Sequence, residues 1–353
     1  MRILQVIQEL EIGGAEGTVL SLVRRARAQG HDVAVAAASG RLASELDAPL
    51  FPLPLLRRRP WRIPRAAWSL DRIVGRWRPT IVHCHNPGMA IAASLAVRRR
   101  RRVGALVTVH GVPEEDYPAA ARILRAARLP VVACGPGVEA GLREHGVECL
   151  AVVPTSISPA PPAADRARLE AEWGVPAGAP LLLAVGRLAA QKNFALAVRA
   201  LREVPAARLV VVGEGALRAE LEREAARANV GERVVFAGGR RDARAIMGAA
   251  DVLVAPSRWE GHPRVVLEAL AAGTPVVATA ARGLRELLTH EVDALLVPPE
   301  DEAALAAAVR RLLEDVRLGA RLTDAGRKVA ARYEEGAEVA AYLALYREVV
   351  GRS

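Results

Sequence analysis

The sequence predicts an α/β protein with two doubly wound parallel sheets, each covered by helices on both faces. Its length of 353 residues favours two domains, at roughly 150 residues each. Short, continuously apolar runs alternate with helix-length amphipathic segments in both halves. Between the halves, residues 154–164 are rich in proline, which neither a helix interior nor a central strand accommodates. We therefore place an interdomain linker in this stretch.

Short apolar runs predict the strands. Continuously apolar strands, rather than alternating ones, are typical of sheets buried on both faces. The predicted strands of the first half are Arg2–Ile7, Asp32–Ala36, Thr80–His83, Ala105–Val109 and Pro130–Ala133, and those of the second half are Leu181–Val185, Arg208–Val212, Arg233–Phe236, Asp251–Ala255, Pro275–Ala278 and Ala294–Val297.

The end of the chain has helical patterning. Glu300–Asp315, Leu318–Tyr333 and Ala337–Val350 are predicted as successive helices. We divide the chain into an N-terminal domain (1–160), a C-terminal domain (161–336) and a terminal helix (337–353) that packs back on the N-terminal domain. The sequence gives no prediction of oligomeric state.

Composition and charge limit the classes of partner. The formal charge is +10, which is compatible with phosphorylated ligands, anionic lipid or nucleic acid. Aromatic residues make up only 3% of the chain, so few rings are available to stack on bases, and we expect no nucleic-acid partner. The three cysteines lack paired metal-type spacing, which favours a reduced, cytoplasmic protein.

One basic segment suggests contact with a membrane surface. No apolar run is long enough to span a bilayer, and the first one contains Gln5, unlike a secretory signal. The segment Arg57–Trp68 mixes arginine with tryptophan, as interfacial surfaces do. A solvated face and a peripheral contact at the inner face of the membrane are about equally well supported for it.

Glycine-rich turns follow strands in both halves. Gly13 and Gly14 precede a helix, where glycines permit positive φ and close approach of a ligand to free N–H groups. In the second half, Gly186 ends a strand and is followed by Arg187 and Lys192. Two cations beside a strand end suit a diphosphate.

An acidic residue precedes the start of a later helix. Glu260, Gly261, His262 and Pro263 lead into a predicted helix, 264–272, that contains Glu268. Pro263 suits a first helical position, which leaves N–H donors unpaired, and Glu268 could accept hydrogen bonds from ribose hydroxyls. Since the sequence contains no Asp-x-Asp pair, we expect fixed cations rather than a metal to neutralise a diphosphate.

These motifs resemble glycosyltransferase family 4, retaining enzymes of the GT-B architecture. The most specific stretch is Glu260-Gly-His-Pro-Arg-Val-Val-Leu-Glu268, and other matches are Gly13–Glu16, Val82–His85, Thr108–Gly111, Gly186–Leu188, Gly213–Gly215 and Phe236–Gly238. The resemblance implies two Rossmann-like domains with an interdomain cleft, the N-terminal one on the acceptor side and the C-terminal one binding a nucleotide-sugar donor.

The resemblance also implies roles for individual residues. Arg187 and Lys192 would bind the donor diphosphate, Glu268 the ribose, and Glu260 the donor sugar, with His110 near the transferred sugar. These four groups, His110, Glu260, Arg187 and Lys192, are the predicted catalytic ones. The predicted donor-binding set further comprises Gly13, Gly14, Gly186, Gly213, Gly238, Arg240, Gly261, His262, Pro263, Arg264, Val265 and Glu268. Glu16, His85 and Asn86 are acceptor-side candidates.

The expected function is transfer of a hexose-type sugar, with retention and without metal or cofactor, from a UDP- or GDP-sugar to a hydroxyl of a small-molecule or lipid-linked acceptor. A nucleotide-sugar 2-epimerase is the enzymatic alternative, and a basic nucleic-acid-binding protein is the alternative from another class. Two departures from the family pattern bear on specificity: Pro154-Thr-Ser-Ile-Ser158 replaces the common Pro-Asn-Gly-Val-Asp, and His262 replaces an aromatic residue.

Overall fold

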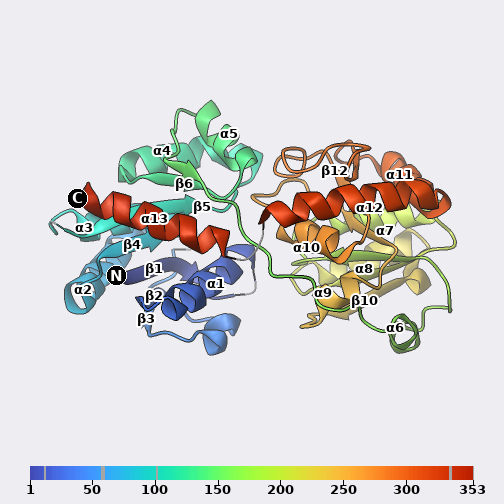
Figure 1. Cartoon of the computed structure of the whole chain (residues 1–353), viewed down its shortest axis with the longest axis horizontal. Helices are drawn as coiled ribbons and strands as arrows, with labels where there is room; N and C mark the ends of the chain where they lie inside the picture. The colour runs from blue at the N-terminus through green and yellow to red at the C-terminus, as the bar shows by residue number, and fades with distance from the viewer. Residues whose placement is uncertain (12, 57–59, 101, 334–335, 353) are drawn as a thin grey trace. The chain divides into compact units, whose positions relative to one another are not determined.

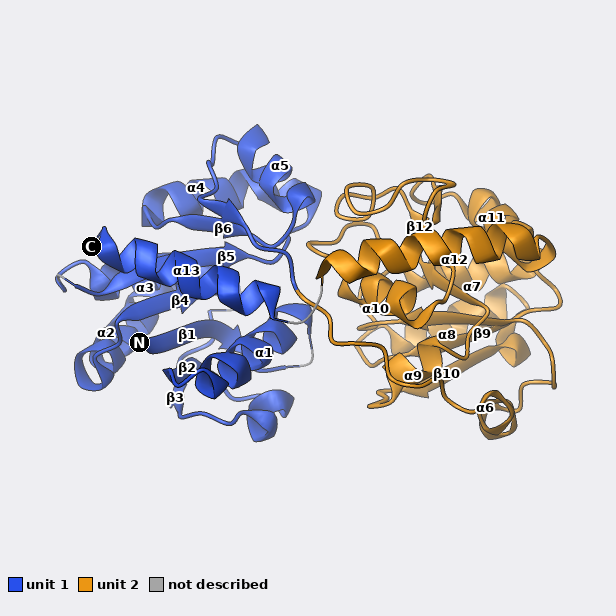
Figure 2. Cartoon of the chain, in the orientation of Figure 1, with its two compact units in different colours: residues 1–155, 336–353 blue, residues 156–335 orange. Residues whose placement is uncertain are grey.

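A computed structural model describes residues 1–11, 13–56, 60–100, 102–333 and 336–352 (Figure 1). The chain forms two compact units (Figure 2): unit 1 comprises residues 1–155 with 336–353, and unit 2 comprises residues 156–335. The change from unit 1 to unit 2 thus falls at the beginning of the proline-rich stretch.

Unit 1 is built on a parallel sheet of order β3-β2-β1-β4-β5-β6-β7. Its strands are β1 (Arg2–Glu9), β2 (Asp32–Ala38), β3 (Leu50–Pro52), β4 (Ile81–Cys84), β5 (Gly104–Val109), β6 (Val131–Ala133) and β7 (Ala151–Val152), and its α-helices are α1 (Gly14–Ala28), α2 (Ile63–Trp77), α3 (Pro87–Val97), α4 (Tyr117–Ala127), α5 (Pro136–Glu144) and α13 (Ala337–Gly351).

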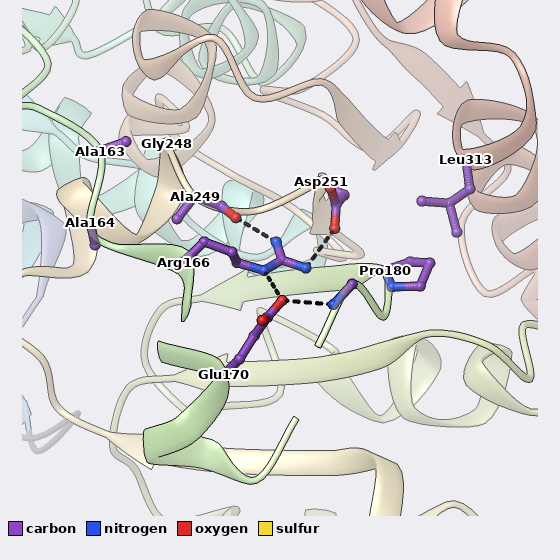
Figure 3. Close-up of a pocket in the computed structure, with 10 residues that line it drawn as sticks. Ala163, Ala164, Arg166, Glu170, Pro180, Gly248, Ala249, Asp251 and Leu313 are labelled. Carbon is purple, nitrogen blue, oxygen red and sulfur yellow. Dashed lines mark hydrogen bonds and ion pairs between the residues drawn. The ribbon is translucent and has the colours of Figure 1, made fainter. Parts of the chain in front are cut away.

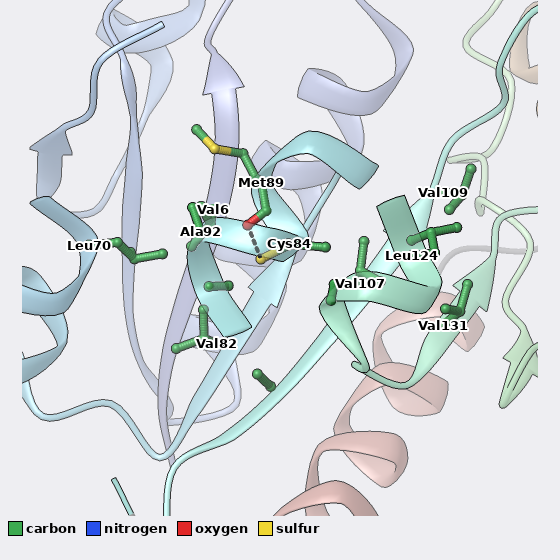
Figure 4. Close-up of a cluster of buried hydrophobic side chains, with 14 of the residues drawn as sticks. Val6, Leu70, Val82, Cys84, Met89, Ala92, Val107, Val109, Leu124 and Val131 are labelled. Atoms are coloured by element: carbon green, nitrogen blue, oxygen red, sulfur yellow. Dashed lines mark hydrogen bonds between the residues drawn. The ribbon is translucent and has the colours of Figure 1, made fainter. Parts of the chain in front are cut away.

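Alternate residues of the unit 1 strands enter two separate cores. Leu4 and Val6 of β1 pack with α2, α3, α4 and α5, whereas Ile3 and Ile7 pack with α1 and α13. Figure 4 shows the first of these cores, in which the thiol of Cys84 lies 3.8 Å from the carbonyl oxygen of Met89. The terminal helix α13 therefore covers one face of the unit 1 sheet, beside α1.

Unit 2 repeats the architecture with sheet order β10-β9-β8-β11-β12-β13, also parallel. Its strands are β8 (Leu181–Val185), β9 (Arg208–Val212), β10 (Val234–Gly238), β11 (Val252–Ala255), β12 (Val276–Thr279) and β13 (Leu295–Val297), and its α-helices are α6 (Arg166–Trp173), α7 (Phe194–Ala200), α8 (Arg218–Arg227), α9 (Ala243–Met247), α10 (Arg264–Ala272), α11 (Glu302–Glu314) and α12 (Val316–Ala330).

The strand orders define where ligands are expected. In each sheet the chain reverses its direction of winding at one place, between β1 and β4 in unit 1 and between β8 and β11 in unit 2. Ligands of open parallel sheets bind outside the carboxyl ends of the strands at this switch point. The fold class of two doubly wound parallel sheets is confirmed, whereas the predicted interdomain cleft stays a prediction.

Two short edge strands were not predicted. β3 and β7 contain three and two residues, too few for a periodic pattern, and β3 ends in a proline, which is tolerated at an edge. The positive φ that glycine permits is not used at Gly13 or Gly14. Gly13 is extended, with φ of −170°, and Gly14 begins α1, so neither occupies the left-handed region.

One glycine allows α12 to lie close to α10, the helix that carries Glu268. A Cβ atom at Gly326 would lie 2.5 Å from Cδ2 of Leu270, which is buried. On the same helix, a Cβ at Gly319 would meet no atom within 4 Å. We predict that Gly326→Ala destabilises unit 2 by about 1–3 kcal/mol through overpacking.

The matched Gly319→Ala variant should instead gain up to about 1 kcal/mol, since alanine is the better helix former. Urea unfolding of both variants, followed by circular dichroism, tests the pair. Equal stability of the two variants would show that α12 and α10 do not pack as closely as described.

Candidate donor-binding site

The best-defined group of chemically active residues in unit 2 follows β8 and β11, the two strands at the switch point. Lys192 lies in the loop after β8 and Glu260 in the loop after β11. The Lys192 Nζ atom is 2.6 Å from Oε1 of Glu260, and the two side chains are 18% and 8% exposed. This ion pair connects the two loops at the carboxyl edge of the sheet.

Other hydrogen bonds fix the Glu260 carboxylate. The Ser257 hydroxyl donates to Oε1 over 2.6 Å, and Gln191 Nε2 donates to Oε2 over 3.3 Å. The backbone is held as well, because Arg258 N donates to the carbonyl oxygen of Gln191 over 2.8 Å. Glu260 is therefore a buried, preorganised carboxylate.

The two loops also share a contact with Glu300. Arg258 Nε and Asn193 Nδ2 both donate to Oε1 of Glu300, over 2.7 and 3.1 Å. The Arg258 guanidinium holds the pKa of the Glu300 carboxyl below its usual range. These contacts tie both loops to Glu300, which precedes α11.

Glycines bring the strand ends close together. Gly186 and Gly213 have φ of 149° and 145°, and a Cβ at Gly213 would lie 1.9 Å from the carbonyl oxygen of Gly186. Gly213 N in turn donates to the carbonyl oxygen of Gly238 over 2.8 Å. Only glycine fits at position 213, so the backbones that follow β8, β9 and β10 form one tight rim.

The start of α10 presents free amide groups beside Glu260. Within the described part of the chain, the N–H groups of Gly261, His262 and Val265 have no hydrogen-bond acceptor. Unpaired N–H groups at a helix N-terminus form an anion-binding site. Pro263 is the residue that precedes the helix rather than its first residue, and α10 begins at Arg264.

The predicted donor-binding residues differ in how far their side chains are already engaged with other protein groups. Arg187 is exposed and has no ion-pair partner among the described residues. Arg240 is held by Asp242 and Glu172, which raise the pKa of its guanidinium, so its side chain has less freedom to bind a ligand. Glu268 accepts from Arg264 Nε over 3.2 Å and lies 3.8 Å from Arg244 Nε.

His262 is an unusual member of this site. Both ring nitrogens are buried and lack a hydrogen-bond partner in the described structure, and the ring lies 4.9 Å from that of Tyr333. Burial lowers the pKa of His262 to about 4, so the imidazole is neutral near pH 7. Buried, unpaired nitrogens are costly unless a ligand or water satisfies them.

In unit 1, the acceptor-side candidates follow β1 and β4, and the predicted catalytic residue His110 follows β5. His85 Nδ1 lies 2.9 Å from His110 Nε2, and the two rings stack with centroids 5.2 Å apart. Burial lowers the pKa of His85 well below its usual range and that of His110 to about 4. Asn86 accepts from Met89 N over 3.0 Å and caps α3, and a Cβ at Gly13 would collide with the Glu16 carboxylate.

No cluster of three or more His, Cys, Asp or Glu side chains suited to a metal occurs within the described ranges. Ser257 and Gln191, which fix Glu260, were missed by sequence analysis. Ser257 lies in the family-matching stretch Asp251–Pro275, and Gln191 precedes Lys192, but neither residue had been given a role.

A hollow of about 580 Å³ lies at the opposite edge of the unit 2 sheet (Figure 3). It is lined by Arg166, Glu170, Pro180 and Asp251, and the last two precede β8 and β11. Arg166 donates to Glu170, to Asp251 and to the carbonyl oxygens of Ala179 and Ala249. This guanidinium joins α6 to the sheet and is fully engaged, so the hollow is not the candidate site.

Comparisons with known proteins agree with these features. Residues 12–161 match the family model "Glycosyltransferase Family 4", and residues 165–329 match "Glycosyl transferases group 1". The fold is that of GT-B glycosyltransferases. The chain belongs to glycosyltransferase family 4, as its motifs predicted.

Individual relatives are similar over different lengths. The lipopolysaccharide core biosynthesis glycosyltransferase LpsD of Rhizobium meliloti (strain 1021) is 36% identical over 63% of this chain and 64% of its own length. The chain spans between about half and two thirds of the first curated relatives it matches.

Two solved structures show the fold over the whole chain. Sucrose-phosphate synthase from Thermosynechococcus elongatus has a TM-score of 0.84 and 24% identity, and covers 100% of both chains. HepE from Anabaena, solved in complex with UDP-glucose, has a TM-score of 0.82 and 21% identity, and also covers 100% of both chains.

The buried imidazole of His262 predicts an acid-sensitive stability. The unfolded chain protonates this group near pH 6.5 and the folded chain only near pH 4, so stability falls as the pH drops through this window. Replacing His262 by Phe should remove this contribution and flatten the dependence of the unfolding free energy on pH between about 6.5 and 4.

The matched control is His290→Asn, at a histidine whose side chain is 55% exposed. Urea unfolding at several pH values measures both variants against the parent. A pH dependence that His262→Phe leaves unchanged would contradict the burial of this ring.

Proposed function

We propose that this protein transfers a hexose-type sugar, with retention of configuration, from a UDP- or GDP-sugar to an acceptor hydroxyl. The observation that carries the proposal is the fixed Lys192–Glu260 pair beside the free amides of α10, at the switch point of the unit 2 sheet. Cations and amides suit a diphosphate there, and a buried carboxylate suits sugar hydroxyls. Unit 2 is thus the donor-binding domain in this proposal.

The chemistry follows from the charges of the site. As the bond between the anomeric carbon and the diphosphate oxygen breaks, negative charge accumulates on the leaving diphosphate. Arg187, Lys192 and the N-terminus of α10 stabilise that charge, which is the electrostatic contribution that a metal would otherwise make. The acceptor hydroxyl attacks from the same face, and its proton passes to the departing phosphate, so no protein nucleophile is required.

Two further roles complete the donor site. Glu268 accepts hydrogen bonds from the ribose hydroxyls, in competition with Arg264 and Arg244, which lie beside its carboxylate. The backbone at Gly238 and beyond holds the base. UDP is the first nucleotide to test, because the fold is also that of HepE, which was solved with UDP-glucose.

On the acceptor side, we place His110 at the transferred sugar and Glu16 and His85 near the acceptor. Asn86 contributes by capping α3, which fixes the loop after β4. The acceptor is a small molecule or a lipid-linked saccharide, and the activity requires no metal, which an assay in the presence of a chelator checks directly.

Arg187 allows a sharp test of the donor site. It is exposed and unpaired within the described residues, so removing its charge should not cost folding stability. Arg187→Ala should weaken UDP or GDP binding by roughly 10- to 100-fold, the loss of a charge-assisted hydrogen bond. Calorimetric titration with UDP, GDP and uridine measures this loss.

Arg223→Ala is the matched control, because Arg223 is an exposed arginine on α8 whose Nε bonds only its own helix. It should bind nucleotide like the parent. Absence of binding of either nucleotide by folded parent protein would reject the proposal, as would an Arg187→Ala variant with unchanged affinity.

A peripheral membrane contact is proposed for the segment before and within α2. Trp61 and Trp68 are 70% and 59% exposed, and Arg72 lies over the Trp68 ring at 4.8 Å. Arg57, Arg58 and Arg59 lie outside the described residues. Within the described residues no helix is long and apolar enough to cross a bilayer. Exposed tryptophans beside arginines suit an anionic lipid surface.

Replacing Trp61 and Trp68 by Ser should reduce flotation with phosphatidylglycerol vesicles several-fold, since both rings lose interfacial burial. Arg223→Ala, which removes an exposed charge from the other unit, should float like the parent. If the parent protein does not float with anionic vesicles, the membrane contact is rejected and a water-soluble acceptor is indicated.

A further inference from the structure

A chain of buried hydrogen-bonded side chains connects α13 with the carboxyl end of the unit 1 sheet. It begins at Tyr346 of α13, passes through Gln5 of β1 and His85 after β4, and ends at His110 after β5. Tyr346, Gln5 and His85 are at most 2% exposed. Residues from opposite ends of the chain therefore meet in one network, on the sheet face that α13 covers (Figure 1).

The distances make each link a well-formed hydrogen bond. Tyr346 Oη lies 3.2 Å from Gln5 Nε2, Gln5 Oε1 lies 2.7 Å from His85 Nε2, and His85 Nδ1 lies 2.9 Å from His110 Nε2. Burial lowers the pKa of both histidines, so each ring carries one proton near pH 7. A neutral imidazole has one donor and one acceptor nitrogen.

The direction of these bonds determines where each proton lies. Gln5 Oε1 can only accept, so His85 must donate from Nε2, which leaves Nδ1 of His85 as an acceptor. His110 must then donate from Nε2. The proton of His110 is thereby assigned to Nε2, and its Nδ1 keeps a lone pair.

Tyr346 lies at the other end of this chain of hydrogen bonds. Its oxygen accepts from Gln5 Nε2, and its own proton is available for His83 Nδ1, 2.7 Å away. His83 then donates from Nε2 to Thr108 Oγ1 over 2.7 Å. In this arrangement the Tyr346 oxygen accepts the Gln5 amide N–H while Gln5 Oε1 faces His85, so loss of the hydroxyl would remove the acceptor that belongs to this orientation of the amide.

We propose that Tyr346 is a positioning residue for His110: through Gln5 and His85 it holds His110 with its proton on Nε2 and presents Nδ1 as a hydrogen-bond acceptor for a sugar hydroxyl. The ligand part rests on the proposed function, in which His110 contacts the transferred sugar. A sugar hydroxyl would then donate to His110, whereas the other tautomer would offer a donor at the same position. A donor sugar without the hydroxyl that faces His110 would lose the hydrogen bond to Nδ1.

The test is the tautomer of His110, measured by long-range ¹H–¹⁵N correlation on protein labelled at histidine and assigned with His110→Asn. The parent should show the proton on Nε2. Tyr346→Phe removes the orienting hydroxyl and should produce a mixture of both tautomers. Tyr342→Phe is the matched control, because Tyr342 is an equally buried tyrosine of α13 whose hydroxyl bonds Thr108 at the far end of the network.

The activity readout is separate. With a donor identified, Tyr346→Phe should lower kcat roughly 3- to 10-fold, the loss of one neutral hydrogen bond in the transition state, with less change in KM. A parent protein with the His110 proton on Nδ1 would overturn the proposal without any variant, as would Tyr346→Phe with the parent's tautomer. Confirmed tautomers without nucleotide binding would leave the network established and reject the proposed function.

Discussion

The hydrogen-bonded, buried carboxylate of Glu260 is the interaction on which the proposed donor site depends. It accepts hydrogen bonds from Lys192, Ser257 and Gln191, which lie in the loops after β8 and β11. A carboxylate with low exposure is expensive unless its charge is compensated, and here a cation and two neutral donors do so. The same contacts fix the loop that leads into α10. The position of the free amides at the start of α10 therefore depends on the hydrogen bonds that hold the Glu260 carboxylate.

The proposed donor site lies at the carboxyl edge of the unit 2 sheet, where ligands of open parallel sheets bind. The backbones after β8 and β9 approach closely only because Gly213 has no side chain, and the loops that carry Lys192 and Glu260 follow β8 and β11, the strands at the switch point. The hollow at the opposite edge contains Arg166, whose guanidinium already donates to Asp251 and to the carbonyl oxygen of Ala249.

Much of this was available from the sequence. Continuously apolar runs predicted the longer strands closely, for example Leu181–Val185 and Arg208–Val212, because burial on both faces leaves no polar positions. The spacing of Glu260 and Glu268 indicated the family. The partners of Glu260 and the connection from Tyr346 to Gln5, 341 positions apart, could not be predicted, since they arise from tertiary packing that local patterns do not record. The reason for glycine at position 13 was not visible in the sequence either, because the Glu16 side chain, rather than the backbone conformation, excludes a Cβ there.

Hydrogen exchange of the backbone amides, measured by mass spectrometry with and without UDP or GDP, tests the central claim most directly. The account predicts that nucleotide slows exchange in peptides covering residues 186–192 and 260–268, because these loops enclose the diphosphate. Protection confined to peptides at 163–180 and 248–251, which line the hollow at the opposite edge, would contradict it.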